Sequence, residues 1–174
     1  EDEALFREKL QRFPQLSAVA VGNLGHLPIV EGLGLEVRGD FGLNVFNSRA
    51  LAFLRELGLV SATVSFELRH QQVRDLAKLL PCEGIVYGRL PLMVMENCIT
   101  KNNVGCRHGA GSTLTDRTGA QFPVQCVYGC RNEIENSLPL FLADKAEWRG
   151  CGLTSARLRF TTETADECAA VLRR

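Results

Sequence analysis

The sequence predicts an α/β fold with parallel strands. Over residues 3–88, segments with the apolar spacing of helices alternate with short apolar runs, and the connections between them are short. The runs at 19–21 and 85–87 are almost continuously apolar, which is typical of strands buried on both faces. A complete (β/α)₈ barrel usually needs about 250 residues. The chain has 174, so we expect either a small open sheet or part of a barrel.

The first elements are a helix and two strands. Residues 3–13 carry apolar side chains at helical spacing, and Pro14 ends the helix. The apolar run at 17–21 predicts a strand that ends at Gly22. Residues 35–38 predict the next strand, which leads into a glycine-containing loop.

Helices and strands continue to alternate after this loop. Asn47 is typical of a helix N-cap, and the helix that follows is expected to end at Gly58. Residues 62–66 are rich in strand formers, residues 69–80 return to helical spacing, and 84–88 predict a buried strand.

The chain closes with one more strand and one more helix. Residues 155–160 predict the strand, which brings the total to about five. Thr164 and Glu167, three residues apart, predict a capping box at the start of the last helix. We expect one structural domain in three segments: βα units of a partial barrel over 1–94, a cysteine-rich region over 95–150, and the closing strand and helix over 151–174.

Composition narrows the class of protein. The 20 basic and 20 acidic side chains balance, so no overall field attracts nucleic acid or an anionic membrane. No apolar run reaches the length of a membrane span, which is about 18–20 residues, and the acidic start is unlike a signal peptide. The chain has seven cysteines, an odd number that argues against a disulfide framework. We therefore expect a cytoplasmic protein with free or metal-bound thiols.

Four cysteines lie close together in the sequence, with 7, 19 and 3 residues between them: Cys98, Cys106, Cys126 and Cys130. Thiolates are the ligands that zinc and iron–sulfur clusters prefer, and four of them can complete either site. The spacing lacks the paired C-x-x-C motifs of a zinc ribbon. The alternative is that these cysteines pack as small buried apolar residues.

Other cysteines and histidines are less specific. His108 could replace a thiolate as a ligand, although a histidine in a surface loop is the commoner case. Cys82, Cys151 and Cys168 are isolated and are expected to pack in the core.

Polar residues in the loops after strands are candidates for the substrate side of a site: Asp40, Asn44 and Glu67. In parallel α/β folds the carboxyl ends of the strands line the active site. Asp40 could instead cap a turn. The sequence contains no nucleophile elbow, zinc-protease helix or Walker loop, so the catalytic residues stay unknown.

The chain resembles the C-terminal part of the peptidase U32 family, the collagenase-like proteases of bacteria. The matching segments occur in family order and cover most of the chain: VGNLG at 21–25, GDFGLNVFNS at 39–48, SFEL at 65–68, YGRLPLMV at 87–94, LTDR at 114–117, FPV at 122–124, CRN at 130–132 and NS at 136–137. The resemblance implies a partial TIM-type barrel to which this chain supplies the later strands, with the cysteine-rich region inserted after one of them.

The resemblance also bears on the metal. Family members carry four cysteines in this region, and some hold a [4Fe–4S] cluster and take part in hydroxylating transfer RNA, ribosomal RNA or a quinone precursor. Cys98, Cys106 and Cys130 match the family positions. Relatives often have a cysteine where this chain has Gly109, so Cys126 would supply the fourth ligand.

Two functions are therefore expected. The first is a U32-type, peptidase-like enzyme that acts on peptides or supports RNA hydroxylation through an iron–sulfur cluster. The alternative is a non-catalytic binding or scaffolding module with a structural zinc. A partial barrel leaves an open sheet edge, so we expect a homo-oligomer or a missing N-terminal half of the barrel, and no membrane partner.

Overall fold

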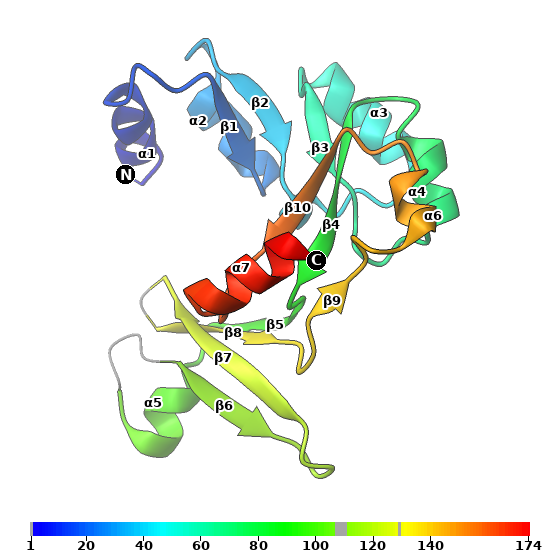
Figure 1. Ribbon diagram of the computed structural model, residues 1–174. Coiled ribbons are helices and arrows are strands. Elements are labelled where there is room, and N and C mark those ends of the chain that lie inside the picture. Colours follow the sequence, from blue (N-terminus) through cyan, green and yellow to red (C-terminus); the bar gives the residue numbers. More distant parts are fainter. Residues whose placement is uncertain (1, 107–110, 129) are drawn as a thin grey trace. The chain divides into compact units, whose positions relative to one another are not determined.

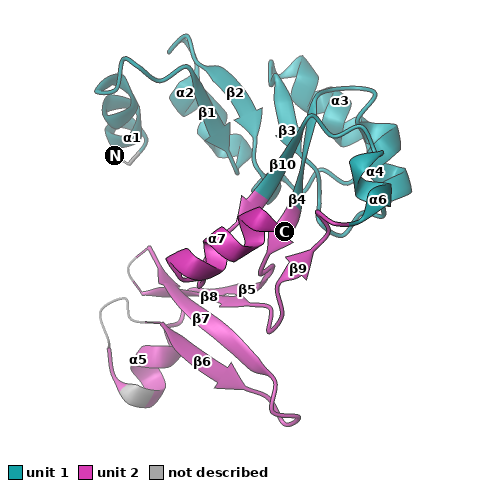
Figure 2. Ribbon diagram, viewed as in Figure 1, with its two compact units in different colours: residues 1–85, 145–157 teal, residues 86–144, 158–174 magenta. Residues whose placement is uncertain are grey.

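A computed structural model describes residues 2–106, 111–128 and 130–174 (Figure 1). The chain forms two compact units (Figure 2). The first comprises residues 1–85 and 145–157, and the second comprises residues 86–144 and 158–174. None of the helices in the described part of the chain is long and apolar enough to span a membrane.

The first unit is built on a five-stranded parallel sheet that curls into a half-barrel (Figure 1). In spatial order its strands are β1 (Ala18–Val21), β2 (Glu36–Gly39), β3 (Ser61–Thr63), β4 (Cys82–Gly88) and β10 (Ser155–Arg159). The last residues of β4 and β10 belong to the second unit. The predicted partial barrel of parallel strands is thus confirmed.

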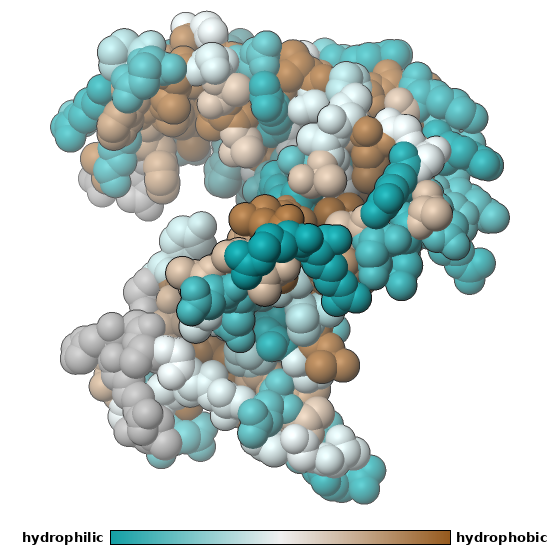
Figure 3. All heavy atoms as spheres, in the orientation of Figure 1, coloured by the Kyte–Doolittle hydropathy of each residue, from teal (hydrophilic) through white to brown (hydrophobic). Residues whose placement is uncertain are grey.

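The described part of the first unit contains the three predicted helices, near residues 3–13, 50–57 and 69–80, and four short helical elements that the sequence did not predict. They are α1 (Asp2–Gln11), η1 (Leu24–His26), α2 (Leu27–Val30), η2 (Phe41–Leu43), α3 (Ser48–Glu56), α4 (His70–Leu76) and α6 (Ala146–Arg149). Leu51 and Leu54 of α3 and Val73 and Leu76 of α4 are buried in one apolar cluster with residues of the sheet. The visible outer side of α3 and α4 is mainly hydrophilic, as expected of amphipathic helices (Figure 3).

Local signals place the ends of α3. The side chain of Asn47 accepts a hydrogen bond from the backbone N–H of Ala50 at 2.9 Å, which confirms the predicted N-cap. Gly58 follows the helix with a φ of 86°, a conformation that glycine adopts at little cost.

The prediction that both apolar strands are buried on both faces holds for β4 and is wrong for β1. Ile85, Val86 and Tyr87 are all buried, whereas Ala20 of β1 is exposed and Val21 alone in that strand is buried. The difference follows from the position of β1 at the edge of the sheet. β1 is the first strand in the sheet order and pairs with β2 alone in the described part of the chain.

The second unit contains a four-stranded antiparallel sheet that the sequence analysis did not predict. Its strands, in spatial order, are β5 (Pro91–Met95), β8 (Arg131–Glu135), β7 (Gln121–Val127) and β6 (Ser112–Thr115). The short helix α5 (Ile99–Val104) connects β5 to β6. This sheet is the cysteine-rich insertion between the strands of the half-barrel.

Two further elements complete the second unit. Strand β9 (Leu140–Phe141) pairs antiparallel with Tyr87 and Gly88 at the end of β4. Helix α7 (Ala165–Arg173) begins with the predicted capping box, because Thr164 and Glu167 exchange side-chain and backbone hydrogen bonds.

Candidate functional site

Two of the four clustered cysteines meet around a buried asparagine. Cys98 lies at the N-cap of α5, and its sulfur accepts a hydrogen bond from the N–H of Lys101 at 3.4 Å. Asn132 is fully buried. Its Oδ1 accepts a hydrogen bond from the N–H of Ile99 at 2.7 Å, and its Nδ2 contacts the sulfur of Cys126 at 3.5 Å. Asn132 therefore connects the start of α5 with strand β7.

These contacts lower the pKa of Cys98. The backbone N–H of Lys101 lowers the pKa of Cys98 most, and burial works against it. Asn132 and the thiol of Cys126 also lower the pKa of Cys98 through hydrogen bonds. The two thiols are thus within reach of each other, in a place where a thiolate is favoured.

The other two predicted ligands are on the surface. Cys106 and Cys130 are exposed, and His108 and Gly109 lie outside the described residues. Among the residues that the structure describes, no three histidine, cysteine, aspartate or glutamate side chains are close enough to hold a metal ion. The donor chemistry of the four cysteines fits a soft metal, but the described arrangement brings together only Cys98 and Cys126.

The isolated cysteines differ from this pair. Cys82 and Cys151 are buried in the apolar core of the first unit, as predicted. Burial raises the pKa of Cys82 to about 11. Cys168 is half-buried in α7. Cys82 and Cys151 are therefore packing residues.

The predicted substrate-side residues lie in the loops that follow β2 and β3. Asp40 Oδ1 accepts a hydrogen bond from the N–H of Phe41 at 2.8 Å, so it caps η2. Asn44 is exposed, with a φ of 46°. Glu67 is exposed, and its N–H donates to Ser65 Oγ at 3.4 Å. The structure records no contact between these three side chains.

Asp40 has a partner that sequence analysis missed. Arg157 of β10 forms ion pairs with Asp40, through Nη1, and with Glu83 of β4, through Nη2 at 2.5 Å from Oε1. Thr63 Oγ1 of β3 donates to the same Glu83 oxygen at 2.8 Å. Each charged side chain is only about a quarter exposed. The sequence signal was weak: arginine recurs at alternate positions in the strand, at 157 and 159.

A cavity of about 270 Å³ lies beside this cluster in the first unit. Strands β1, β2, β3, β4 and β10 all contribute residues to it. The lining side chains are small or polar: Ala18, Val19, Ala20, Arg38, Gly39, Ser61, Ala62, Thr63, Glu83, Ser155 and Arg157. The cavity is therefore a polar recess of the half-barrel.

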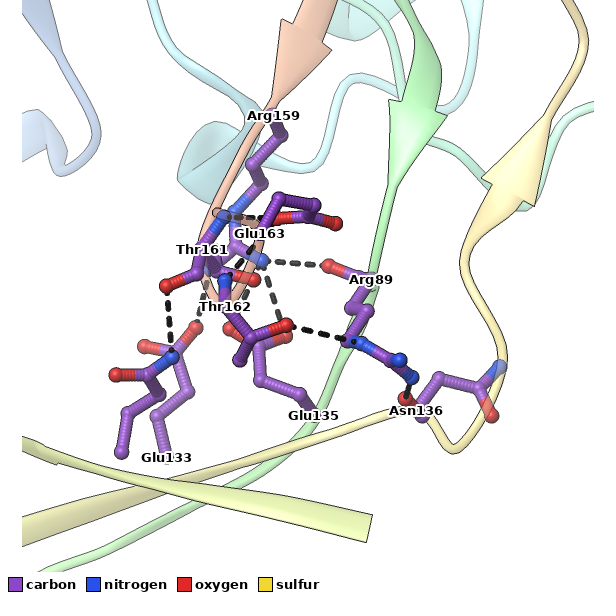
Figure 4. A network of polar contacts seen from close by, with 9 residues as sticks. Arg89, Glu133, Glu135, Asn136, Arg159, Thr161, Thr162 and Glu163 are labelled. Carbon is purple, nitrogen blue, oxygen red and sulfur yellow. Dashed lines mark hydrogen bonds and ion pairs between the residues drawn. The ribbon is translucent and has the colours of Figure 1, made fainter. Parts of the chain in front are cut away.

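The second unit has its own polar network, centred on Arg159 (Figure 4). Arg159 contacts Glu133 and Glu135 of β8, and it also donates to the backbone carbonyl of Arg89 at 2.5 Å. Arg89 in turn donates to the carbonyls of Asn136 and Ser137 and to Thr162 Oγ1. These contacts tie the segment between β10 and α7 to the antiparallel sheet.

Glu163 extends the same network. Its carboxylate accepts hydrogen bonds from the N–H groups of Thr161 and Thr162 at 2.8 and 3.0 Å, and from the hydroxyl of Tyr87 at 3.0 Å. All of these hydrogen bonds and ion pairs join groups of the protein to one another, so we interpret the network as a structural brace.

Comparison with known proteins does not assign the chain to a family. No protein-family model, curated protein or solved structure matches the chain. The resemblance to the peptidase U32 family therefore rests on the matching segments themselves.

Proposed function

We propose that the chain is part of a U32-type, peptidase-like enzyme, acting on peptides or supporting RNA hydroxylation. The observation that carries the proposal is the position in the fold of the segments that resemble the U32 family. Segments 21–25, 39–48 and 65–68 begin at or just after the ends of β1, β2 and β3. In parallel α/β folds this edge of the sheet holds the active site. Asp40, Asn44 and Glu67 are all in or next to these segments, on the substrate side.

The proposal includes a metal held by Cys98, Cys106, Cys126 and Cys130. A [4Fe–4S] cluster held by these cysteines would supply electron transfer. Asn132 contacts the thiol of Cys126 and the backbone N–H of Ile99, the residue after Cys98, which supports a shared role for Cys98 and Cys126. Arg131 and Asn132, which directly follow Cys130, belong to one of the resembling segments.

A structural zinc is the second candidate. Cys98 caps α5 and Cys126 lies in β7, so a metal between them would fasten the helix to the sheet. Closed four-thiolate zinc sites contribute to folding in this way. The chain would then be a binding or scaffolding module without its own catalysis.

Metal analysis after anaerobic purification separates these candidates. About four irons and four sulfides per chain, with broad visible absorbance, support the enzyme. About one zinc and no colour support the scaffold. Cys126→Ala should reduce the metal content, and Cys168→Ala is the matched control because Cys168 is half-buried in α7 of the same unit. If neither metal binds after reconstitution, both candidates are wrong.

We also propose a cytoplasmic location and a partner for the sheet edge. All seven cysteines are free thiols, which suits a reducing compartment. In the described part of the chain β1 pairs with β2 only. A second copy of the chain or the remaining half of a barrel would cover its open side. Light scattering of the purified chain distinguishes a dimer from a monomer.

A further inference from the structure

The cavity of the first unit differs from the interior of a closed barrel. Barrel interiors are filled by layers of bulky, branched apolar side chains. Here the lining residues of β2, β3, β4 and β10 are mostly polar, and those of β1 are small. A recess with a few convergent polar groups is the usual form of a small-molecule site. The question is which chemistry those groups recognise.

Glu83 presents an acceptor to this cavity. In the described part of the chain, Thr63 Oγ1 and Arg157 Nη2 both reach its carboxylate at the same oxygen, Oε1. The other oxygen, Oε2, keeps its capacity to accept hydrogen bonds. Arg157 is paired with two carboxylates, those of Asp40 and Glu83, so this group of three carries a net negative charge. Glu83 is therefore suited to a cationic donor such as an ammonium group.

Arg38 presents a cation to the same cavity. Its guanidinium pairs with Glu36 at 3.0 Å, and the two side chains are 56% and 55% exposed. Exposed ion pairs of this kind contribute little to stability. An incoming carboxylate can therefore take the place of Glu36 at small cost, and the planar fork of arginine matches a carboxylate well.

The two groups lie on the same face of the sheet, two strands apart. Arg38 is in β2 and Glu83 is in β4, with β3 between them. Strands two places apart are separated by about 10 Å. Arg38 is in register with Ser61 and Glu83 with Thr63, so the two residues are also offset by two residues along the strands. The long side chains of Arg38 and Glu83 must therefore turn toward a molecule that bears an ammonium group and a carboxylate on one carbon, and each makes a hydrogen bond of about 2.9 Å to it. A cavity of about 270 Å³ is slightly below the range of sites for drug-sized ligands, which is about 300–1,000 Å³.

We propose that this cavity binds a zwitterion of the α-amino-acid type, with its ammonium group on Glu83 and its carboxylate on Arg38. The hydroxyls of Ser61, Thr63 and Ser155 line the space between. Ala18 and Ala20 leave room for a small side chain. The site lies in the first unit and uses none of the clustered cysteines, so it is independent of the metal proposed above.

The test is titration of the ¹⁵N-labelled 174-residue chain with L-alanine, L-serine and L-leucine, followed by NMR. Shifts should concentrate on the cavity strands β1, β2, β3, β4 and β10. N-acetyl-L-alanine lacks the ammonium charge and L-alanine methyl ester lacks the carboxylate. Each should bind at least about tenfold more weakly than L-alanine, because each loses one charge-assisted hydrogen bond.

Variants locate the two ends of the ligand. Glu83→Gln and Arg38→Met should each weaken L-alanine binding by at least about tenfold. Arg74→Met, which removes an exposed arginine of α4 away from the cavity, is the matched control. Arg38→Met should also abolish the preference for L-alanine over L-alanine methyl ester. Glu83→Gln should abolish the preference for L-alanine over N-acetyl-L-alanine.

Three results overturn the proposal: no shifts with any amino acid at millimolar concentration, a blocked analogue that binds as tightly as L-alanine, or unchanged affinity for L-alanine in both cavity variants. The analogue series uses the unmodified chain, so it stays decisive even if a variant fails to fold. None of these results bears on the metal content, so this proposal and the proposed function can fail separately.

Discussion

One nitrogen of Arg159, Nη1, donates to both carboxylate oxygens of Glu135, at 2.9 and 3.0 Å. Glu135 is only 1% exposed, and Nη2 of the same arginine holds Glu133 at 2.6 Å. Burial raises the pKa of Glu135, and the interaction with Arg159 opposes this rise. The arginine is therefore what allows two acidic side chains to lie next to each other inside the second unit.

The first prediction concerns this arginine. Arg159→Met should lower the free energy of unfolding by about 3 kcal/mol or more, because it leaves buried carboxylates without their partner. Urea unfolding followed by circular dichroism measures the change. Lys78→Met is the control, since Lys78 pairs with Asp75 on the surface and such pairs contribute less than about 1 kcal/mol. A similar loss in both variants would contradict the bracing role of Arg159.

The second prediction is a pH dependence at Glu163. Burial alone would raise the pKa of Glu163, but hydrogen bonds from the backbone and from Tyr87 lower it below the ordinary value of 4.5. A carboxyl whose pKa is lower in the folded state stabilises the fold above its unfolded pKa, and this stability is lost as the pH falls through the folded pKa.

Glu163→Gln tests this directly. The variant should be less stable than the parent by about 1 kcal/mol at neutral pH, since it weakens hydrogen bonds to a charged acceptor. The difference should shrink once the pH falls below 4.5, the ordinary pKa of the group. Urea unfolding at several pH values gives the result. A difference that stays constant with pH would show that the ionised carboxylate is not the stabilising form.

The sequence predicts the ends of helices well because the signals for them are local. Asn47 caps a helix three residues away, and Thr164 and Glu167 form a box within a single turn. The apolar spacing of α3 and α4 follows directly from which helical face is buried. None of these inferences requires knowledge of a distant contact.

The sequence analysis did not predict the antiparallel sheet because several of its buried positions are occupied by polar residues. Strand β8 buries Asn132 and Glu135, two polar residues, so the alternation that marks a half-buried strand is missing. Its neighbour β5 has the opposite character, since Leu92, Met93 and Val94 are all exposed. Pattern reasoning fails where polar side chains are buried in pairs and networks.

The sequence analysis did not predict the cavity or the ion pairs beside it, because the residues that form them are far apart in the sequence. Arg157 pairs with Asp40 from a position 117 residues away in the sequence. Spacing along the chain carries no information about such a contact. Sequence analysis therefore placed Asp40 at the correct edge of the sheet but could not supply its partner.

The third prediction compares two glycines. Gly88 has a φ of 133°, and a Cβ added there would overlap the backbone carbonyl oxygen of Arg159. Gly119 has a φ of 88° with nothing within 4 Å of an added Cβ. Gly119→Ala should cost about 1–2 kcal/mol from backbone strain alone. Gly88→Ala should cost clearly more, because the chain that carries Arg159 must also move. Thermal unfolding of both variants measures the difference, and equal losses would contradict the close approach.

The last prediction concerns the seven thiols and tests the grouping of the clustered cysteines. In metal-free folded protein, iodoacetamide should modify the exposed Cys106 and Cys130 first. Cys82 should stay unmodified, because it is buried and its pKa is raised to about 11.

Addition of Zn²⁺ should then slow the labelling of Cys98, Cys106, Cys126 and Cys130 together, because a shared metal protects all its ligands at once. Cys168 should be unaffected, and mass spectrometry of the digested protein reports each site. Protection of Cys98 and Cys126 alone would mean that the exposed pair does not join the site. Equal protection of Cys168 would mean that the zinc effect is not specific to the clustered thiols.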